Sequence, residues 1–355
     1  MLASLLNSGI IGLDIGSSSI KIAILSKKSV ASYRLDNCDI AVYDKECFSE
    51  SGEILEFDYV QDAVAKLLDK HKIKPRNVVM GIPHRLITQD NISLSNDIPA
   101  DEQNYQLEVE ANRMLPPGVA ASFDYFLTKN TAQTNSNSST TFSILSTAKN
   151  LVDDRVDILS INKRSKPIIV DSDAYAALRN THYVWKNEGA VDQVRVLLHL
   201  GHSGSYMFVI YNQDVIYQQN LVTHGIQLTQ TIMRYYDLPY IEAETKKVSQ
   251  NLPAGYNEDL LLPYLENTVI DVYQGVQNFF STSSLSRVDG IYISGGHGLI
   301  EGLAVQIAKK THITTQLFNP FLGLLRNSNI DESLLRKNMP VYTTAIGLAL
   351  RGLDN

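Results

Sequence analysis

Apolar residues at the start of the chain follow the alternation of a β-strand. Residues 10–14 form a short apolar run, and Ile20, Ile22 and Ile24 then alternate with a lysine and an alanine after a turn of glycine and serine. A period of two places successive side chains on opposite faces of a strand, and glycine and serine favour tight turns. The pattern therefore predicts a β-hairpin with a Gly-Ser tip.

Helical periodicity follows this hairpin. The apolar residues of segment 59–71 recur on one helical face: Val60, Val64, Leu67 and Leu68. After Pro75, residues 78–82 form an apolar strand. Strand, helix and strand in this order predict an α/β layer.

The pattern changes between residues 83 and 163. Segments 87–95 and 123–127 are predicted as strands, and segment 101–115 as a helix that ends at Pro116. Proline ends a helix because it lacks the backbone donor and restricts the residue before it. These elements predict a small inserted α+β subdomain.

The second half of the chain repeats the organisation of the first. Residues 194–200 and 206–211 are predicted as strands joined by the turn GHSGS, and a helix predicted at 174–185 precedes them. Asp14 and His199 occupy equivalent positions, each followed two residues later by a glycine. A repeat that occurs twice, rather than at a short period, indicates a duplicated pair of domains.

Composition narrows the classes of function. The 355 residues, 44% of them hydrophobic, are enough for two cores. A net charge of -7 with mixed signs argues against nucleic acid as a main partner. Cys38 and Cys47 lack metal-ligand or CxxC spacing, which favours a reducing, cytoplasmic setting. No apolar run is long enough to span a bilayer, so we expect no direct membrane insertion.

The turn of the first hairpin has the residues that phosphate binding needs. Small residues let consecutive backbone N–H groups point into one concavity, where a phosphate can approach. Asp14 would face that concavity and hold the hydration shell of Mg²⁺, while Lys21 would neutralise a phosphate oxygen. An ordinary Gly-Ser hairpin is the alternative. The turn residues are Gly16, Ser17, Ser18 and Ser19.

A third glycine-rich segment, GIYISGGHGLIEGL, combines an apolar strand, two glycines and a helix start. Gly295 and Gly296 would let the backbone lie against an adenine ring or ribose, and the N-terminus of the helix favours an anion. A plain link between strand and helix is the alternative. Two phosphate-type hairpins earlier in the chain favour the nucleotide interpretation.

Five segments in order resemble the motifs of the actin-like ATPase superfamily, from phosphate 1 to connect 2: GLDIGSSSIK, IVDSDAYAAL, LHLGHSGSYM, ISGGHGLIEG and TTAIGLALRG. Within it the chain is most similar to the PilM family, the cytoplasmic, FtsA-like component of type IV pilus assembly. That similarity rests on EANRMLPPG, FDYFL, HGIQLTQTI, PYIEAETKKV and LFNPF, and on an insertion that precedes IVDSD.

The resemblance implies an α/β, actin-like fold of the duplicated ribonuclease-H type, with two domains and an FtsA-type inserted α+β subdomain. The implied boundaries are 1–84 and 164–190, completed by the C-terminal helix, for the first domain; 85–163 for the inserted subdomain; 191–230 and 287–355 for the second domain; and 231–286 for a helical subdomain on the adenine side.

The resemblance also implies that the chain binds ATP and Mg²⁺, with Asp14 holding the metal through water. Glu244 and Lys247 would lie near ribose and adenine, although such charges can also be solvated residues of a helix surface. The implied nucleotide-binding residues are Asp14, Gly16, Ser17, Ser18, Ser19, Lys21, Gly201, His202, Ser203, Gly225, Thr229, Glu244, Lys247, Gly295, Gly296 and His297.

One position departs from the superfamily pattern. Phosphate 2 normally begins with an aspartate, and this chain has His199 there. Histidine cannot replace a carboxylate as a hard oxygen ligand, so we expect binding with slow or absent hydrolysis. His199 would bond a phosphate or be held structurally. Asp171 is the candidate for positioning the attacking water.

The resemblance implies a partner, the cytoplasmic N-terminal tail of an inner-membrane PilN-like protein. The tail would bind between the first domain and its insertion, within about the first 165 residues, and further pilus motor or platform proteins are possible partners. Alternatives are an FtsA-like cytoskeletal ATPase, a small-molecule kinase and a scaffold that binds no nucleotide. An FtsA-type filament would usually end in an amphipathic helix, and this sequence ends at LRGLDN.

Overall fold

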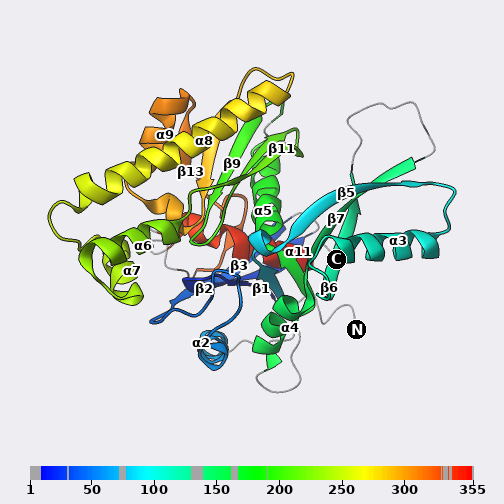
Figure 1. Ribbon diagram of the computed structural model, residues 1–355, viewed down its shortest axis with the longest axis horizontal. Coiled ribbons are helices and arrows are strands. Elements are labelled where there is room, and N and C mark those ends of the chain that lie inside the picture. The colour runs from blue at the N-terminus through cyan, green and yellow to red at the C-terminus, as the bar shows by residue number, and fades with distance from the viewer. Residues whose placement is uncertain are drawn as a thin grey trace.

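Three β-sheets organise the described part of the chain (Figure 1). The computed structural model describes residues 9–29, 32–71, 77–128, 139–160, 167–189, 191–328, 330, 335 and 338–353. Among these residues, no helix has the length and apolar character needed to cross a bilayer.

The first sheet has six strands in the order β14-β3-β2-β1-β4-β8. They are β1 (Ile10–Ile15), β2 (Ser19–Ser29), β3 (Ser32–Val42), β4 (Val78–Ile82), β8 (Ile169–Ser172) and β14 (Leu325–Arg326). The β1–β2 hairpin is antiparallel and β4 runs parallel to β1. Helix α2 (Phe57–Lys70) packs in the core of one face, and α11 (Thr343–Leu353) in that of the other.

The second sheet repeats this arrangement in the order β11-β10-β9-β12-β13. An antiparallel hairpin, β9–β10, is again joined by a parallel strand, β12. The strands are β9 (Val194–Leu200), β10 (Ser205–Tyr211), β11 (Asp214–Leu221), β12 (Gly290–Ser294) and β13 (Thr315–Leu317). Helices α8 (Leu262–Thr282) and α9 (Leu303–Thr311) share one core with it, and α5 (Asp173–Asn187) packs in the other. The predicted duplication is therefore present.

The inserted part is a three-stranded antiparallel sheet, β5-β7-β6, backed by one helix. Its elements are β5 (Thr88–Ser95), α3 (Ala100–Arg113), β6 (Ala121–Leu127), β7 (Ser139–Ala148) and α4 (Lys149–Ile158), with η1 (His84–Leu86) at its start. Figure 1 shows it on one side of the molecule, with α6 (Gly225–Tyr236) and α7 (Tyr240–Ser249) on the other. Three short segments complete the fold: η3 (Asn257–Leu261), η4 (Gly296–Leu299) and η5 (Met339–Tyr342).

The helix expected at 59–71 is confirmed as α2, with its four predicted apolar residues buried. One predicted boundary is wrong: the sequence places segment 287–355 in the second domain except for its last helix, but β14 pairs with β3 in the first sheet. A two-residue strand leaves too little pattern to reveal its partner. The other boundaries stay a prediction.

Candidate functional site

The first phosphate-type hairpin places a lysine and an aspartate side by side. Asp14 on β1 faces Lys21 on β2 in register, and the Lys21 Nζ lies 3.5 Å from the Asp14 Oδ2. The amide of Gly16 donates to the Ser19 carbonyl, which closes the turn at 3.1 Å. A Cβ on Gly16 would stand 3.0 Å from the Lys21 Nζ, so glycine leaves this ammonium room. The buried hydroxyl of Ser17 has no partner among the described residues.

The second hairpin rests on the start of a helix. The amide of Gly201 donates to the Gly204 carbonyl at 2.9 Å, and a Cβ on Gly201 would meet that oxygen at 2.6 Å. The amides of Gly225 and Ile226, which begin α6, donate to the carbonyls of Gly201 and His202. The N-terminus of α6 therefore fixes the position of this turn.

A buried ion pair lies next to the second hairpin. The Lys247 Nζ lies 2.6 Å from the Glu244 Oε2 and donates to the Thr229 hydroxyl at 2.7 Å, while that hydroxyl donates to Glu244. Burial alone would raise the pKa of Glu244, but the charge of Lys247, the neighbouring His202 and the hydrogen bonds from Lys247 and Thr229 together lower it. These residues are thus not solvated helix charges. They form a buried polar network beside the start of α6.

Histidines line the same region in neutral form. The Nε2 of His202 lies 3.0 Å from the Tyr240 hydroxyl, and the Nε2 of His297 lies 2.6 Å from the Tyr264 hydroxyl. Burial lowers the pKa of His202 to about 4 and that of His297 to about 3. Gly295 precedes His297 at φ +86°, where a Cβ would meet the Leu200 carbonyl at 2.3 Å, so only glycine fits.

His199 is held by the neighbouring strand. Its Nδ1 lies 2.8 Å from the hydroxyl of Ser294, the residue opposite it on β12. Burial, and then the charge of Lys21, lower the pKa of His199 to about 4. The imidazole is therefore neutral near pH 7, and it has a structural partner at the position where an aspartate was expected.

The two aspartates in IVDSD, Asp171 and Asp173, have different surroundings in the structure. The Asp171 Oδ2 accepts a hydrogen bond from the Arg179 Nη1 at 2.7 Å. Asp173 is the first residue of α5, and its Oδ1 accepts from the His84 amide at 2.7 Å. Burial, and then the charge of Asp14, raise the pKa of Asp173 to about 7. The charge of Asp14 thus acts on Asp173, a relation that the sequence did not reveal because both aspartates belong to one motif.

The structure brings most of the predicted residues together. They form two groups: one lies around the β1–β2 turn, and the other lies around the start of α6. Gly295, Gly296 and His297 join the second group, because a Cβ on Gly225 would meet the His297 Nδ1 at 3.3 Å. Among the described residues, no cluster of three histidine, cysteine, aspartate or glutamate side chains could hold a metal by itself.

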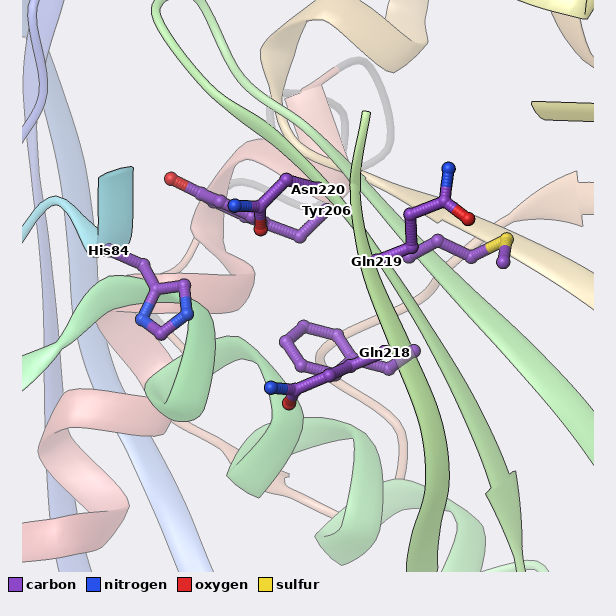
Figure 2. Close-up of a pocket in the computed structure, with 7 residues that line it drawn as sticks. His84, Tyr206, Gln218, Gln219 and Asn220 are labelled. Atoms are coloured by element: carbon purple, nitrogen blue, oxygen red, sulfur yellow. The ribbon is translucent and has the colours of Figure 1, made fainter. Parts of the chain in front are cut away.

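A separate cavity of about 190 Å³ lies between η1 and strands β10 and β11. His84 faces Gln218 and Asn220 across it, whereas Gln219 points to the other face of the sheet (Figure 2). None of its lining residues belongs to the predicted nucleotide set. It lies where the inserted subdomain begins.

Comparison with known proteins gives one family and a consistent fold. The sequence model of the family "Type IV pilus assembly protein PilM" matches residues 12–353. A structure of the PilM–PilN type IV pilus biogenesis complex superposes with a TM-score of 0.81 at 19% identity, covering 98% of this chain and 99% of that chain. Ethanolamine utilization protein EutJ from Carboxydothermus hydrogenoformans gives 0.56 at 13% identity, covering 96% and 89%. The fold is therefore actin-like.

Proposed function

This chain belongs to the PilM family of type IV pilus assembly proteins, and we propose that it binds ATP and acts as an adaptor. In this role it recruits the N-terminal tail of a PilN-like inner-membrane protein and acts in the cytoplasm beside that membrane. The observation that carries the ATP part is the pair of glycine hairpins beside the buried Glu244–Lys247–Thr229 network.

The two groups of residues fit the two ends of a nucleotide. The turn amides, Lys21 and the Ser17 hydroxyl, which has no partner in the part of the chain that the structure describes, would hold phosphates. Glu244 and Lys247 would contact the ribose and base. Asp14 would hold the hydration shell of Mg²⁺, which would neutralise further phosphate charge. The lack of a three-ligand cluster in the described residues agrees with a metal held mainly by water and phosphate.

Hydrolysis would be slow or absent because few ionised carboxylates are available to hold the metal or orient the attacking water. Neutral His199 is bonded to Ser294 and supplies no charge to a metal or an attacking water. Asp173 remains to orient a water, but burial holds its pKa near 7, so the carboxylate is only partly ionised at neutral pH. ATP would then act as a conformational ligand that sets the angle between the domains.

The tail would bind where the first domain meets the inserted sheet. Strand β6 is an edge strand, and its residues Tyr125, Phe126 and Leu127 are exposed. An extended peptide can add to such an edge, with its apolar side chains on those of the strand. The Phe126 ring lies 5.9 Å from that of Tyr175 on α5, so this edge borders the first domain.

Co-purification with a synthetic PilN-like N-terminal peptide tests the proposal. We expect the peptide to be retained with ATP and lost, or weakened, without nucleotide, while a scrambled peptide is not retained. A charge substitution on the exposed edge, Phe126→Asp, should abolish retention and leave ATP binding intact. Failure of the peptide to bind in either state would refute the adaptor role, and absence of ATP binding would refute the nucleotide role.

A further inference from the structure

Arg85 lies where the chain passes from the first domain into the inserted subdomain. It is part of η1, between β4 and β5. Its side chain reaches the second phosphate-type hairpin, where the Nε donates to the Ser203 hydroxyl at 3.2 Å. Its Nη1 donates to the Glu50 carbonyl at 2.7 Å, and its backbone amide to the Tyr206 hydroxyl at 2.8 Å. One residue thus joins both domains and the junction.

The charge of Arg85 is not neutralised in the described part of the chain. Its partners there are a hydroxyl and a carbonyl, and no carboxylate lies within ion-pair distance of its guanidinium among those residues. Burial lowers the pKa of Arg85, although the neighbouring Tyr206 and Asp173 act to raise it. The Nη2 has no hydrogen-bond partner in the same residues. A half-buried guanidinium with a free edge is a typical binding group for an anionic oxygen.

The surroundings of this guanidinium point to phosphate. Ser203 belongs to the hairpin that would hold the phosphates, and a Cβ on neighbouring Gly204 would meet the Arg85 Cδ at 3.6 Å. The charges of Asp14 in the first hairpin and of Arg85 both act on the buried Asp173: Asp14 raises its pKa and Arg85 lowers it. Arg85 therefore lies against the hairpin that is proposed to hold the phosphates.

We propose that Arg85 binds the terminal phosphate of ATP and makes the start of the inserted subdomain respond to ATP rather than ADP. This inference rests on the nucleotide binding proposed above. ADP lacks the terminal phosphate, so its complex would leave Arg85 on Ser203 and Glu50. In the ATP complex the guanidinium donates to the phosphate oxygens through its planar fork.

The contacts of η1 provide the connection to the insertion. The Leu86 carbonyl accepts from the Thr147 hydroxyl at 2.7 Å, which ties η1 to the strand by which the insertion returns. The side chain of Leu86 also packs over Gly52, whose φ is +86° and whose added Cβ would meet the Leu86 Cδ2 at 2.6 Å. A shift of Arg85 would therefore reach both connections between the first domain and the insertion: η1, where the chain enters it, and β7, where the chain leaves it.

Nucleotide affinity measured on two substitutions tests the proposal. In Arg85→Gln we expect the affinity for ATP to fall about 10- to 100-fold, the range for a lost charge-assisted hydrogen bond, with ADP affinity unchanged. Arg85→Lys keeps the charge but loses the fork, so its ATP affinity should lie between those of the natural protein and Arg85→Gln. Arg113→Gln, an exposed arginine on α3, is the matched control and should change neither affinity.

Hydrogen exchange supplies the second readout. ATP, but not ADP, should change amide exchange in β5 and β7 of the natural protein, and Arg85→Lys should reduce that difference. An equal loss of ATP and ADP affinity in both Arg85 variants, or no loss in either, would overturn the inference and leave the proposed function standing. If the natural protein bound neither nucleotide, the proposed function and this inference would both fail.

Discussion

Glu244 and Lys247 form a buried ion pair at the proposed nucleotide site. Their side chains are only 14% and 11% exposed, and Thr229 accepts from one and donates to the other. Two charges withdrawn from water remain stable only when each compensates the other. The pair is therefore a fixed feature, available to a ligand without rearrangement.

Lys247→Met should destabilise the protein strongly, because it leaves the buried Glu244 carboxylate with a hydrogen bond from Thr229 but without the cation that compensates its charge. We expect the free energy of unfolding to fall by about 3 kcal/mol or more, measured by urea denaturation. Lys246→Met is the matched control, since Lys246 pairs with exposed Glu242 at 3.7 Å on the same helix, and it should cost less than about 1 kcal/mol. Equal losses would contradict the role of the buried pair.

His199→Asp should restore the carboxylate that the position lacks. Ser294 can donate to the new side chain, and the negative charge would lie near Lys21. We expect steady phosphate release from ATP to rise by at least about tenfold over the natural protein. His199→Asn keeps a polar partner for Ser294 without the charge and should not raise the rate. Similar rates in the two variants would show that His199 does not limit hydrolysis.

Helix α11 shows how closely the central elements approach. A Cβ on Gly347 would lie 1.7 Å from the Ala176 carbonyl of α5, and a Cβ on Gly12 of β1 would lie 1.8 Å from the Ala345 carbonyl of α11. Glycine is a poor helix former, so its presence here follows from packing and not from propensity. These contacts fix α11 between α5 and the first sheet.

Gly347→Ala should therefore destabilise the fold, although alanine favours helices. We expect the free energy of unfolding to fall by about 3 kcal/mol or more, because backbone atoms of α5 must move. Gly275→Ala in α8 is the matched control: its added Cβ would meet the flexible end of Met207 at 3.0 Å, which can shift. Chemical denaturation should separate the two variants, and a stable Gly347→Ala protein would contradict the packing argument.

At the scale of the molecule, several histidines are buried in neutral form. His84, His199 and His202 all have a pKa lowered to about 4 by burial, and that of His297 is lowered to about 3, from the usual 6.5. Each would have to be protonated against its buried surroundings. The stability of the folded state should therefore be sensitive to acid.

Stability should fall as the pH drops from about 6.5 towards 4. In that window the unfolded chain binds protons on these histidines and the folded chain does not, so protons favour unfolding. Each group contributes up to about 1.4 kcal/mol per pH unit. Urea midpoints measured across the window should decline, with a shallower decline in His199→Asn. Buried Asp173, whose pKa is raised, has the opposite effect, so the decisive comparison is the difference in slope: equal slopes in the natural protein and His199→Asn would refute the buried neutral state of His199.

The hydrophobic pattern by itself determined the principal elements, because the buried residues of α2 recur at the spacing of a helix, whereas β1 and β9 are short, largely apolar runs of the kind that form buried strands. The two glycine hairpins and the duplication were likewise readable, since the turns need small residues. Strand β14 was not, because two residues carry no period and only pairing with β3 places them. Nor did the sequence distinguish Asp171 from Asp173, or bring Arg85 to Ser203 across 118 positions. Those relations depend on which groups the folded chain buries together, and only the tertiary structure decides that.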